Sequence, residues 1–545
     1  MHQMNNNIKE IDIDWSGERV IPAFQVPRQL KIYDIRTASH HVQLTVATLV
    51  GLINQPQPQV YLISRNNDTF WLKEVLSSIP QDFSNLTNEA ILEDLLAMYR
   101  HKLHGLIIYD PALVDSINIA TMLAAQRDSI IISPSQAQAL QQSPHNLPIL
   151  ADLRTYKWNN RMQAYRWAQQ HLLANTTPHL IAGLNPQTSL GIRPFLVATR
   201  TFIYWLDSRN FLPNPRAGYK SERALMRQIL CAHPAGVAHL GWFIDEGTGV
   251  MLASRAAKPV LASDYFSNLE VWAATQRDVQ DVQQITSHSK PSSEKYEKRD
   301  IPAKVYISFT MSEGDNLQYI QEHLLNLWRD PARGSVPIGW TISPVLVEAA
   351  PAMAAYYAGT ATLNDELIAG PGGAGYIFPS FWPAAQLPEF LQRTGELMQR
   401  MNLTILEVLD VNIFQNPNLA LRALIKGSGL AFINKNLQRR FVQGLSPFGV
   451  RGILSGAGQH NSSWNIISGV PVYQNTGIVE SVSGAVSAIK RATPPNHQRP
   501  YFLNVYVLAW RMTPSDLKQV AQQLGDEYEV VTPGRLLAML AETSS

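Results

Sequence analysis

Short apolar runs alternate with helix-like segments through the first part of the chain. The four runs occupy residues 60–64, 105–109, 129–133 and 148–150. Between them, residues 89–104 repeat apolar side chains at helical spacing, as Leu92, Leu95 and Leu96 do. Strand–helix alternation of this kind predicts a small open α/β sheet, which we assign to an N-terminal domain of residues 1–150.

The alternation continues through residues 151–300, which we expect to form a second α/β domain. A helix is predicted at 161–174, and the apolar segments HLIAGL, FLVATRTFIYWLD and KPVLASD follow it. Residues 277–302 are polar and contain Pro291 followed by two serines. This composition is typical of a linker or a long surface loop.

Eight further apolar runs lie in residues 301–545, a stretch close to the roughly 250 residues of a (β/α) barrel. The runs are KVYISFT, PIGWTIS, ELIAG, LTILEV, VRGILS, PVYQN, FLNVYVLA and YEVVT. Helical patterns follow most of them, among them residues 317–329, 384–400 and 515–524. The chain is therefore predicted to be α/β, with two N-terminal α/β domains and a C-terminal barrel-like domain of seven or eight strands.

Composition and charge exclude several classes of protein. The 545 residues include 45 basic and 43 acidic side chains, and a net charge of +2 argues against a nucleic-acid or polybasic membrane surface. No run approaches the roughly 20 apolar residues that span a bilayer, and the N-terminus lacks the apolar core of a signal peptide. We expect a cytoplasmic protein without nucleic-acid or membrane partners, or a secreted or periplasmic one if a leader has been removed.

Metal and cofactor motifs are also missing from the sequence. The single cysteine, Cys231, allows neither an internal disulfide nor a cysteine-based metal site, and we expect it to be a small buried residue on a helix. His101 and His104 have helical spacing, but no third ligand is evident. Phosphate-binding loops and nucleophilic-serine elbows do not occur. We therefore expect no metal and no cofactor.

The sharpest candidate for chemistry is the segment ISFTMSEGDNLQY, in which an apolar strand runs into Glu313 and Asp315. Residues two apart in an extended chain point the same way, and the carboxyl ends of barrel strands form the active-site face. Both carboxylates are candidates for the acid, base or nucleophile of glycoside hydrolysis, with Asn316 bonding a sugar hydroxyl. An equal alternative is that Asp315 only caps the helix that follows.

Two further segments contain acidic residues at strand ends or helix starts. In LTILEVLDVN, Glu407 lies inside an apolar strand, where a carboxylate is costly unless it is paired or faces a pocket. Glu407 is thus a third catalytic candidate, with a structural salt bridge as the alternative, and the catalytic pair is expected to be Asp315 with either Glu313 or Glu407. Asp410 near the strand end is a substrate-binding candidate. Asp245 and Glu246 in GWFIDEGTGVMLAS are weaker substrate-binding candidates, because both precede a predicted helix and would serve as caps.

A glycine-rich aromatic loop, LIAGPGGAGYIFPSFWP, occupies residues 367–383. No helix start follows its glycines, so nucleotide binding is disfavoured. Gly375 would let the backbone approach a ligand closely. Tyr376 and Trp382, together with Trp340 on an earlier strand, are candidates to stack on a sugar ring. The alternative is that these rings seal the core.

These motifs resemble one known family. The residues GAGYIFP, 373–379, are similar to the GxGYxYP signature, with Phe378 in place of its second tyrosine. SFTMSEGDN is similar to the S-D-G-D-N strand end of that family, with Glu313 in place of the first aspartate. GWFIDEGTGVMLAS, PVLASDYFSNLEVW and YFLNVYVLAW…VVTPGRLL also agree with the family pattern in order, so the resemblance covers most of the chain.

The resemblance implies N-terminal α/β domains, a C-terminal catalytic-like barrel and a carbohydrate substrate. The acidic candidates named above then favour a glycoside hydrolase that uses carboxylate chemistry. One alternative is a non-catalytic glycan-binding or scaffold protein, since the departures at Glu313 and Phe378 are compatible with lost activity. Another is an enzyme similar to the polysaccharide deacetylases. That alternative ranks lower, because those enzymes need a metal with histidine ligands and the sequence has no H-x-x-x-H pair.

Overall fold

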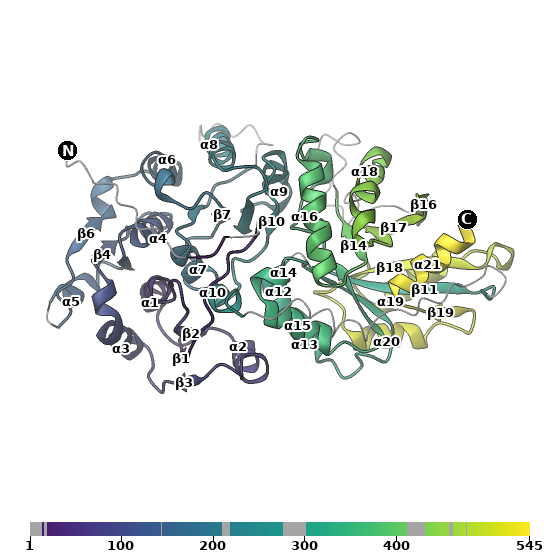
Figure 1. Ribbon diagram of the computed structural model, residues 1–545, viewed down its shortest axis with the longest axis horizontal. Helices are drawn as coiled ribbons and strands as arrows, with labels where there is room; N and C mark the ends of the chain where they lie inside the picture. Colours follow the sequence, from purple (N-terminus) through teal and green to yellow (C-terminus); the bar gives the residue numbers. More distant parts are fainter. Residues whose placement is uncertain are drawn as a thin grey trace. The chain divides into compact units, whose positions relative to one another are not determined.

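The computed structural model divides the chain into two compact units (Figure 1), and each is described by itself. The residues described are 13–15, 19–142, 144–209, 219–275, 301–314, 316–410, 431–456, 462–475 and 477–544. Unit 1 comprises Met1–Gly249, Ala262–Gln276 and Glu348–Ala352, and unit 2 comprises Val250–Leu261, Arg277–Val347 and Met353–Ser545. Among the described residues, no helix is long and apolar enough to cross a membrane.

The described part of unit 1 contains three small parallel sheets, with neighbouring strands in the orders β2-β1-β3, β5-β4-β6 and β9-β7-β8. The strands are β1 (Leu30–Asp34), β2 (Val60–Ile63), β3 (Gln81–Phe83), β4 (Gly105–Ile108), β5 (Ser129–Ile132), β6 (Ile149–Asp152), β7 (Leu180–Gly183), β8 (Phe202–Tyr204) and β9 (Ala238–Gly241). The predicted α/β character is confirmed, but three sheets stand where two domains were expected. Periodicity identifies strands and does not identify their partners.

Helices cover these sheets. They are α1 (His40–Ile53), α2 (Asn66–Phe70), η2 (Trp71–Val75), α3 (Glu89–Tyr99), η3 (Arg100–Lys102), α4 (Ser116–Gln126), α5 (Ala137–Gln141), η4 (Leu153–Tyr156), α6 (Arg161–His171), η5 (Leu173–Asn175), α7 (Arg193–Ala198), α8 (Tyr219–Cys231) and α10 (Leu269–Trp272). Three more, α9 (Glu246–Arg255), α14 (Leu346–Ala349) and α15 (Pro351–Gly359), have residues in both units. Cys231 is exposed at the end of α8, so the expectation of a buried cysteine is wrong.

The core of unit 1 is centred on α1. The hydroxyl of Ser39 caps this helix by accepting the N–H of Val42 at 3.4 Å. One apolar cluster joins Leu49 of α1 to Leu62 of β2 and Ile130 of β5. The first two sheets therefore share a single core. The burial of their apolar side chains against α1 explains why such short strands are stable.

Unit 2 is built on a nine-stranded sheet in the order β16-β17-β15-β14-β13-β12-β11-β18, with β19 pairing with β11. The strands are β11 (Val305–Ser312), β12 (Ile338–Ile342), β13 (Asp365–Ala369), β14 (Ile405–Val408), β15 (Gly452–Ser455), β16 (Ser463–Ile467), β17 (Val470–Gln474), β18 (Tyr501–Leu508) and β19 (Tyr528–Val530). All eight predicted runs form strands. The ninth, β16, was not predicted, and it alone pairs antiparallel among the described ladders of this sheet.

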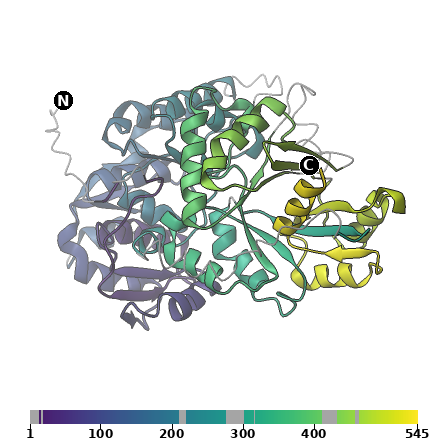
Figure 2. The ribbon, with the colours of Figure 1, turned by 45° about the vertical axis from the view of Figure 1, so that its right-hand side comes forward.

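Helices follow most of these strands (Figure 2). They are α12 (Leu317–Gln321), α13 (His323–Trp328), η8 (Pro379–Phe381), α16 (Leu387–Arg400), α18 (Lys435–Leu445), η10 (Ser446–Phe448), α19 (Val482–Ala492), η11 (Asn496–Gln498), α20 (Pro514–Gln522) and α21 (Pro533–Ser544), and β10 (Val260–Leu261) also belongs to this unit. The predicted helix 317–329 is two short helices, α12 and α13. The predicted linker 277–302 lies almost wholly outside the described residues.

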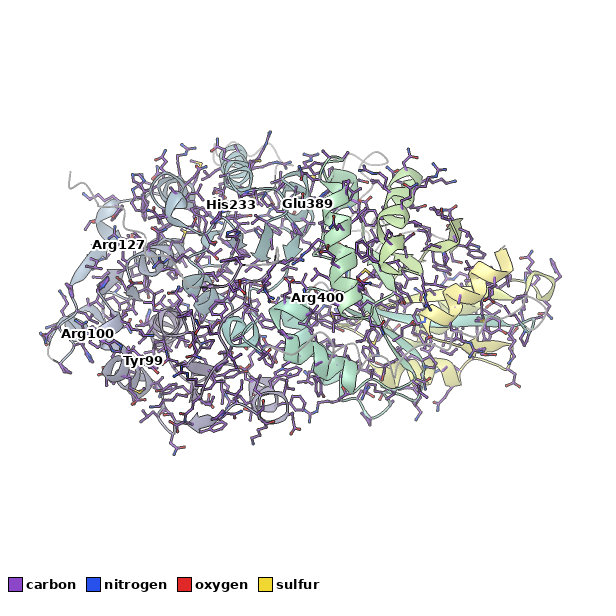
Figure 3. All side chains as sticks on the ribbon, viewed as in Figure 1. Tyr99, Arg100, Arg127, His233, Glu389 and Arg400 are labelled. Atoms are coloured by element: carbon purple, nitrogen blue, oxygen red, sulfur yellow. The ribbon has the colours of Figure 1, made fainter. Side chains whose placement is uncertain are left out.

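The helix α16 shows why these segments fold as predicted. Leu387, Leu391 and Met398 lie on one buried face at helical spacing. Glu389 lies in the first turn and Arg400 in the last (Figure 3), where each charge interacts favourably with the helix dipole.

The large sheet of unit 2 is strongly curled. Five strands lie between β17 and β18, so in a flat sheet these two would be roughly 29 Å apart. The hydroxyl of Tyr473 on β17 nevertheless donates to the carbonyl of Phe502 on β18, and it accepts the N–H of Asn504, both at 3.1 Å. Val479 and Val507 form an isolated bridge, but the described residues form no continuous ladder between β17 and β18. The predicted barrel is therefore seen as a curled half-barrel sheet.

The helix α21 closes the amino ends of these strands. It contacts β11, β17 and β18, and Leu536 and Leu540 pack in one apolar cluster with Ile405 at the start of β14 and Phe502 near the start of β18. The apolar part of the interior thus lies at the amino ends of the strands, and polar side chains gather nearer the carboxyl ends.

Candidate active site

Alternate residues of β11 and β18 form a buried polar face. They are Ser308, Thr310, Ser312, Asn504 and Tyr506. The strands pair in register, with Ser308 opposite Asn504 and Thr310 opposite Tyr506, so these side chains share one side of the sheet. The amide oxygen of Asn504 accepts both hydroxyls, from Ser308 at 2.7 Å and Thr310 at 2.8 Å. Its amide nitrogen donates to Asn475, just past β17, at 2.8 Å, which places the polar face inside the curl.

Glu407 of β14 projects into the same interior and is fully buried. Burial raises the pKa of this carboxyl to about 7, although the nearby hydroxyls of Tyr506 and Ser312 lower it. Those two hydroxyls are themselves bonded, with Tyr506 donating to Ser312 at 2.6 Å. Among the described residues neither carboxyl oxygen has a partner at good hydrogen-bond geometry. We conclude that the hydroxyls lie beside the buried carboxyl without forming a well-aligned hydrogen bond to it.

Glu313 follows the last residue of β11 in an unusual backbone conformation. Its φ is 147°, in a region that residues other than glycine rarely adopt. The N–H groups of Glu313 and Gly314 both donate to the hydroxyl of Thr341 on β12, at 3.1 and 2.9 Å. That hydroxyl donates in turn to the carbonyl of Met311 at 2.9 Å. One threonine therefore holds the strand end that carries Glu313.

Tyr506 connects the two glutamates. Burial raises the pKa of its phenol well above the ordinary value, and the charges of Glu407 and then of Glu313 raise it further. Both carboxylates thus lie near one phenol, although they come from different strands. Two carboxylates near the carboxyl ends of parallel strands form an arrangement suited to acid–base chemistry.

Two predicted site residues, Asp315 and Asn316, follow Glu313 in the sequence. Asn316 is the N-cap of α12, and its side-chain oxygen accepts the N–H of Tyr319 at 3.0 Å. The predicted role of Asn316 in sugar binding would have to use its amide N–H groups. Asp315 lies outside the described residues, so its catalytic role stays a prediction.

The glycine-rich loop is packed tightly within unit 2. Tyr376 forms an antiparallel bridge with Val260 of β10, through N–H···O bonds of 2.8 and 3.0 Å. Gly375 has a φ of 135°, and a Cβ there would lie 2.8 Å from the Cβ of Pro259. Gly375 is therefore needed for the loop to pack against the segment before β10.

The aromatic side chains predicted to stack on sugar are buried. Trp340, Tyr376 and Trp382 each lie against another ring. The ring pairs are Trp340 with Trp328, Tyr376 with Phe378, and Trp382 with Phe390. Rings this deeply packed offer no open face to a pyranose in this conformation, which agrees with the alternative that they seal the core.

The remaining acidic candidates have structural partners. Asp410, just past β14, accepts the N–H of Ser380 at 3.0 Å and its hydroxyl at 2.5 Å, and so holds the end of the glycine-rich loop. In unit 1, Asp245 caps α9 by accepting the N–H of Thr248 at 3.0 Å and its hydroxyl at 2.6 Å. Glu246 is exposed at the first position of that helix.

Sequence reasoning missed the polar side chains of this interior, which are Ser308, Thr310, Ser312, Asn475, Asn504 and Tyr506. A signal was present, because FLNVYVLA places Asn504 and Tyr506 two apart in an otherwise apolar strand, and hence on one face. No group of three or more histidine, cysteine, aspartate or glutamate side chains in the described part of the chain is arranged to hold a metal ion.

Comparisons with known proteins match four family models along the chain. They are "GxGYxYP_N 1st domain" at residues 29–101, "GxGYxYP_N second domain" at 103–176, "GxGYxYP third domain" at 178–274 and "GxGYxYP putative glycoside hydrolase C-terminal domain" at 303–541. No curated protein matches the sequence.

Two solved structures are similar to the chain. One, described as a "putative hydrolase" from Bacteroides thetaiotaomicron VPI-5482, has a TM-score of 0.76 and 20% identity, covers 96% of each chain, and shares the fold. The other is described as a "putative polysaccharide deacetylase" from Mycobacterium smegmatis. It has a TM-score of 0.31 and 9% identity over 45% of this chain and 92% of that one.

Proposed function

Because the chain belongs to the GxGYxYP family, we propose that unit 2 hydrolyses a glycosidic bond in a carbohydrate, with Glu407 as the proton donor. The observation that carries this proposal is the buried position of Glu407, on the polar inner face of the curled sheet and beside two hydroxyls. The unpartnered oxygens of Glu407 and the unpartnered amide nitrogen of Asn475 support it, since buried polar atoms without partners in the described structure are groups that a bound ligand or water would satisfy.

Glu407 has the properties of a general acid. With its pKa raised to about 7, much of the carboxyl keeps its proton near neutral pH and can still release it. In the proposed step, the proton passes from Glu407 to the glycosidic oxygen as the bond between that oxygen and the anomeric carbon breaks. The hydroxyls of Tyr506 and Ser312 then stabilise the carboxylate that remains.

Glu313 is the proposed second carboxylate, and Asp315 remains an alternative for this role on sequence grounds. The carboxylate of Glu313 would either attack the anomeric carbon or deprotonate a water molecule that attacks it. Carboxyl groups about 5–5.5 Å apart lead to retention of the anomeric configuration, and a separation of about 6.5–9.5 Å leads to inversion. Proton NMR of the first-formed product anomer distinguishes these two routes.

Glu366 provides a matched control within the same sheet. Burial raises its pKa to about 7, as for Glu407. Glu366, however, lies near the amino end of β13 and accepts the N–H of Gly534, in the first turn of α21, at 2.6 Å. A carboxylate at a helix N-terminus stabilises the helix, so we assign Glu366 to the fold and not to the chemistry.

The test is release of reducing sugar from a panel of oligosaccharides and polysaccharides by the wild type, Glu407→Gln and Glu366→Gln. We expect Glu407→Gln to lose roughly 10²- to 10⁴-fold in rate, as for removal of a general acid, and folded Glu366→Gln to stay near the wild-type rate. Undiminished turnover by Glu407→Gln, or an equal loss in both folded variants, would contradict the assignment. Glycan binding without turnover by the wild type would favour a non-catalytic binding protein.

A further inference from the structure

Trp510 is an exposed aromatic residue at the carboxyl end of the curled sheet. It lies two residues beyond β18 and is 47% exposed, unlike the buried rings of the glycine-rich loop. β18 runs parallel to β11 in register, with Leu508 opposite Ser312. Trp510 therefore lies just beyond the same end of the sheet as Glu313.

Neighbouring rings hold the indole of Trp510 in place. The imidazole of His323 stacks on it, with ring centroids 4.6 Å apart and planes 15° from parallel. His323 is itself fixed, because its Nε2–H donates to the carbonyl of Ala509 at 2.9 Å. Tyr319 packs edge-on at 5.4 Å. Since the imidazole covers one face of the indole, its exposure comes mainly from the other face and the outer edge.

Tyr319 also links Trp510 to the proposed catalytic residues. Its phenol is buried, and the nearby charge of Glu313 adds to the rise in its pKa that burial causes. Tyr319 thus has Glu313 as an electrostatic neighbour and Trp510 as a packing neighbour. Trp510 and Glu313 therefore share Tyr319 as a neighbour at the carboxyl end of the sheet.

Exposure alone would carry no meaning, because single apolar side chains are common on protein surfaces. Trp510 differs in being held by two other rings, with one face open, at the catalytic end of the sheet. A rigid aromatic with an open face loses little entropy when a ligand stacks on it. The C–H groups on one face of a pyranose supply the matching apolar surface.

We propose that Trp510 is a stacking platform for a pyranose ring of the carbohydrate bound beside Glu313 and Glu407. The proposal rests on the proposed function, because it places one sugar unit next to the bond that is cleaved. It makes Trp510, and not the aromatic residues of the glycine-rich loop, the aromatic contact with the substrate.

The test measures binding in the full chain carrying Glu407→Gln, so that bound sugar is not hydrolysed. The probes are cellopentaose, xylopentaose, mannopentaose, laminaripentaose, chitopentaose and maltopentaose, titrated by isothermal calorimetry. We expect at least one probe to bind, Trp510→Ala to weaken its binding by about tenfold or more, and Trp510→Phe to keep most of it. Phe83→Ala, which removes a 49% exposed aromatic of unit 1, is the matched control and should change nothing.

The proposal is overturned if Trp510→Ala binds every probe as tightly as the protein that retains Trp510, provided that both are folded and have the same thermal midpoint. Binding of none of the six probes also overturns it. The two proposals fail separately. If turnover depends on Glu407 but Trp510→Ala leaves KM unchanged, the stacking platform alone is ruled out. If binding depends on Trp510 but the wild type shows no turnover, the hydrolase alone is ruled out.

Discussion

Glu407 on β14 and Tyr506 on β18 interact side by side, although three strands separate β14 from β18 in the sheet. In a flat sheet the two strands would be about 19 Å apart. Their contact therefore exists because the whole sheet curls. It brings a buried carboxyl under the influence of a phenol that is distant along the chain and across the sheet.

The pH dependence of stability provides a first prediction for Glu407. Below its ordinary pKa of 4.5 the carboxyl is protonated in both the folded and unfolded chain, so its burial costs little. Between 4.5 and about 7 the unfolded chain releases the proton and the folded chain keeps it, so stability falls as pH rises. Above about 7 the full cost applies, on the order of 3 kcal/mol. Glu407→Gln should therefore raise the thermal midpoint at pH 8 and change it little at pH 4.

The comparison with the wild type isolates this one group. Glu366 and Glu270 also have pKa values raised to about 7, but they titrate in both proteins and cancel in the difference. A Glu407→Gln variant that melts below the wild type at pH 8 would show that the carboxyl supports the fold, and would count against its being kept for chemistry.

Tyr506→Phe should move the titration of Glu407 upward. The phenol lowers the pKa of Glu407, so its loss should raise that pKa above about 7 and shift the alkaline limb of kcat/KM to higher pH. Carboxyl ¹³C NMR of labelled glutamate measures the same shift without a substrate. Ser308→Ala is the control, because the hydroxyl of Ser308 bonds to Asn504 and is not among the groups that shift Glu407. A downward shift would mean that the phenol does not stabilise the charged form of the carboxyl.

Much of the fold was predictable because strand formation is largely local. The eight apolar runs of unit 2 all became strands, and most of them are largely buried, although β19 is only partly so. β16 was missed because its residues, Ser463–Ile467, are mixed in polarity and only partly buried. The curl was beyond prediction, because pairing order and closure depend on residues far apart along the chain.

The candidate site divides in the same way. Glu407 was predictable because burying a carboxylate inside an apolar run is costly, which suggests that the residue has a specific role. Tyr506 was not, because a tyrosine in an apolar strand is ordinary and becomes significant only through a carboxyl on another strand. Trp340 and Trp510 show the same limit, since the sequence does not reveal that one is buried and the other open.

Gly314→Ala should disrupt the strand end that carries Glu313. A Cβ at this position would lie 2.2 Å from the carbonyl carbon of Thr341 and 2.4 Å from the nitrogen of Ile342, and backbone atoms cannot yield as a side chain can. We expect the turn to move, both N–H bonds to Thr341 to weaken, and stability to fall by about 1–3 kcal/mol with loss of turnover. Gly525→Ala, where a Cβ would meet nothing within 4 Å, is the control for unfolding and rate measurements.

Glu313 allows backbone strain and carboxylate chemistry to be separated by two substitutions. Its φ of 147° is readily adopted by glycine and disfavoured for alanine, at a cost of roughly 1–3 kcal/mol. Glu313→Gly should therefore unfold at a higher temperature than Glu313→Ala, although glycine lowers stability at most positions. Both variants lack the carboxylate, so both should lose turnover to a similar degree if Glu313 acts in the reaction. A glycine variant that is stable and active would remove Glu313 from the mechanism and leave Asp315 as the partner of Glu407. Two inactive variants that differ in melting temperature would indicate that the chain retains a strained backbone to hold this carboxylate.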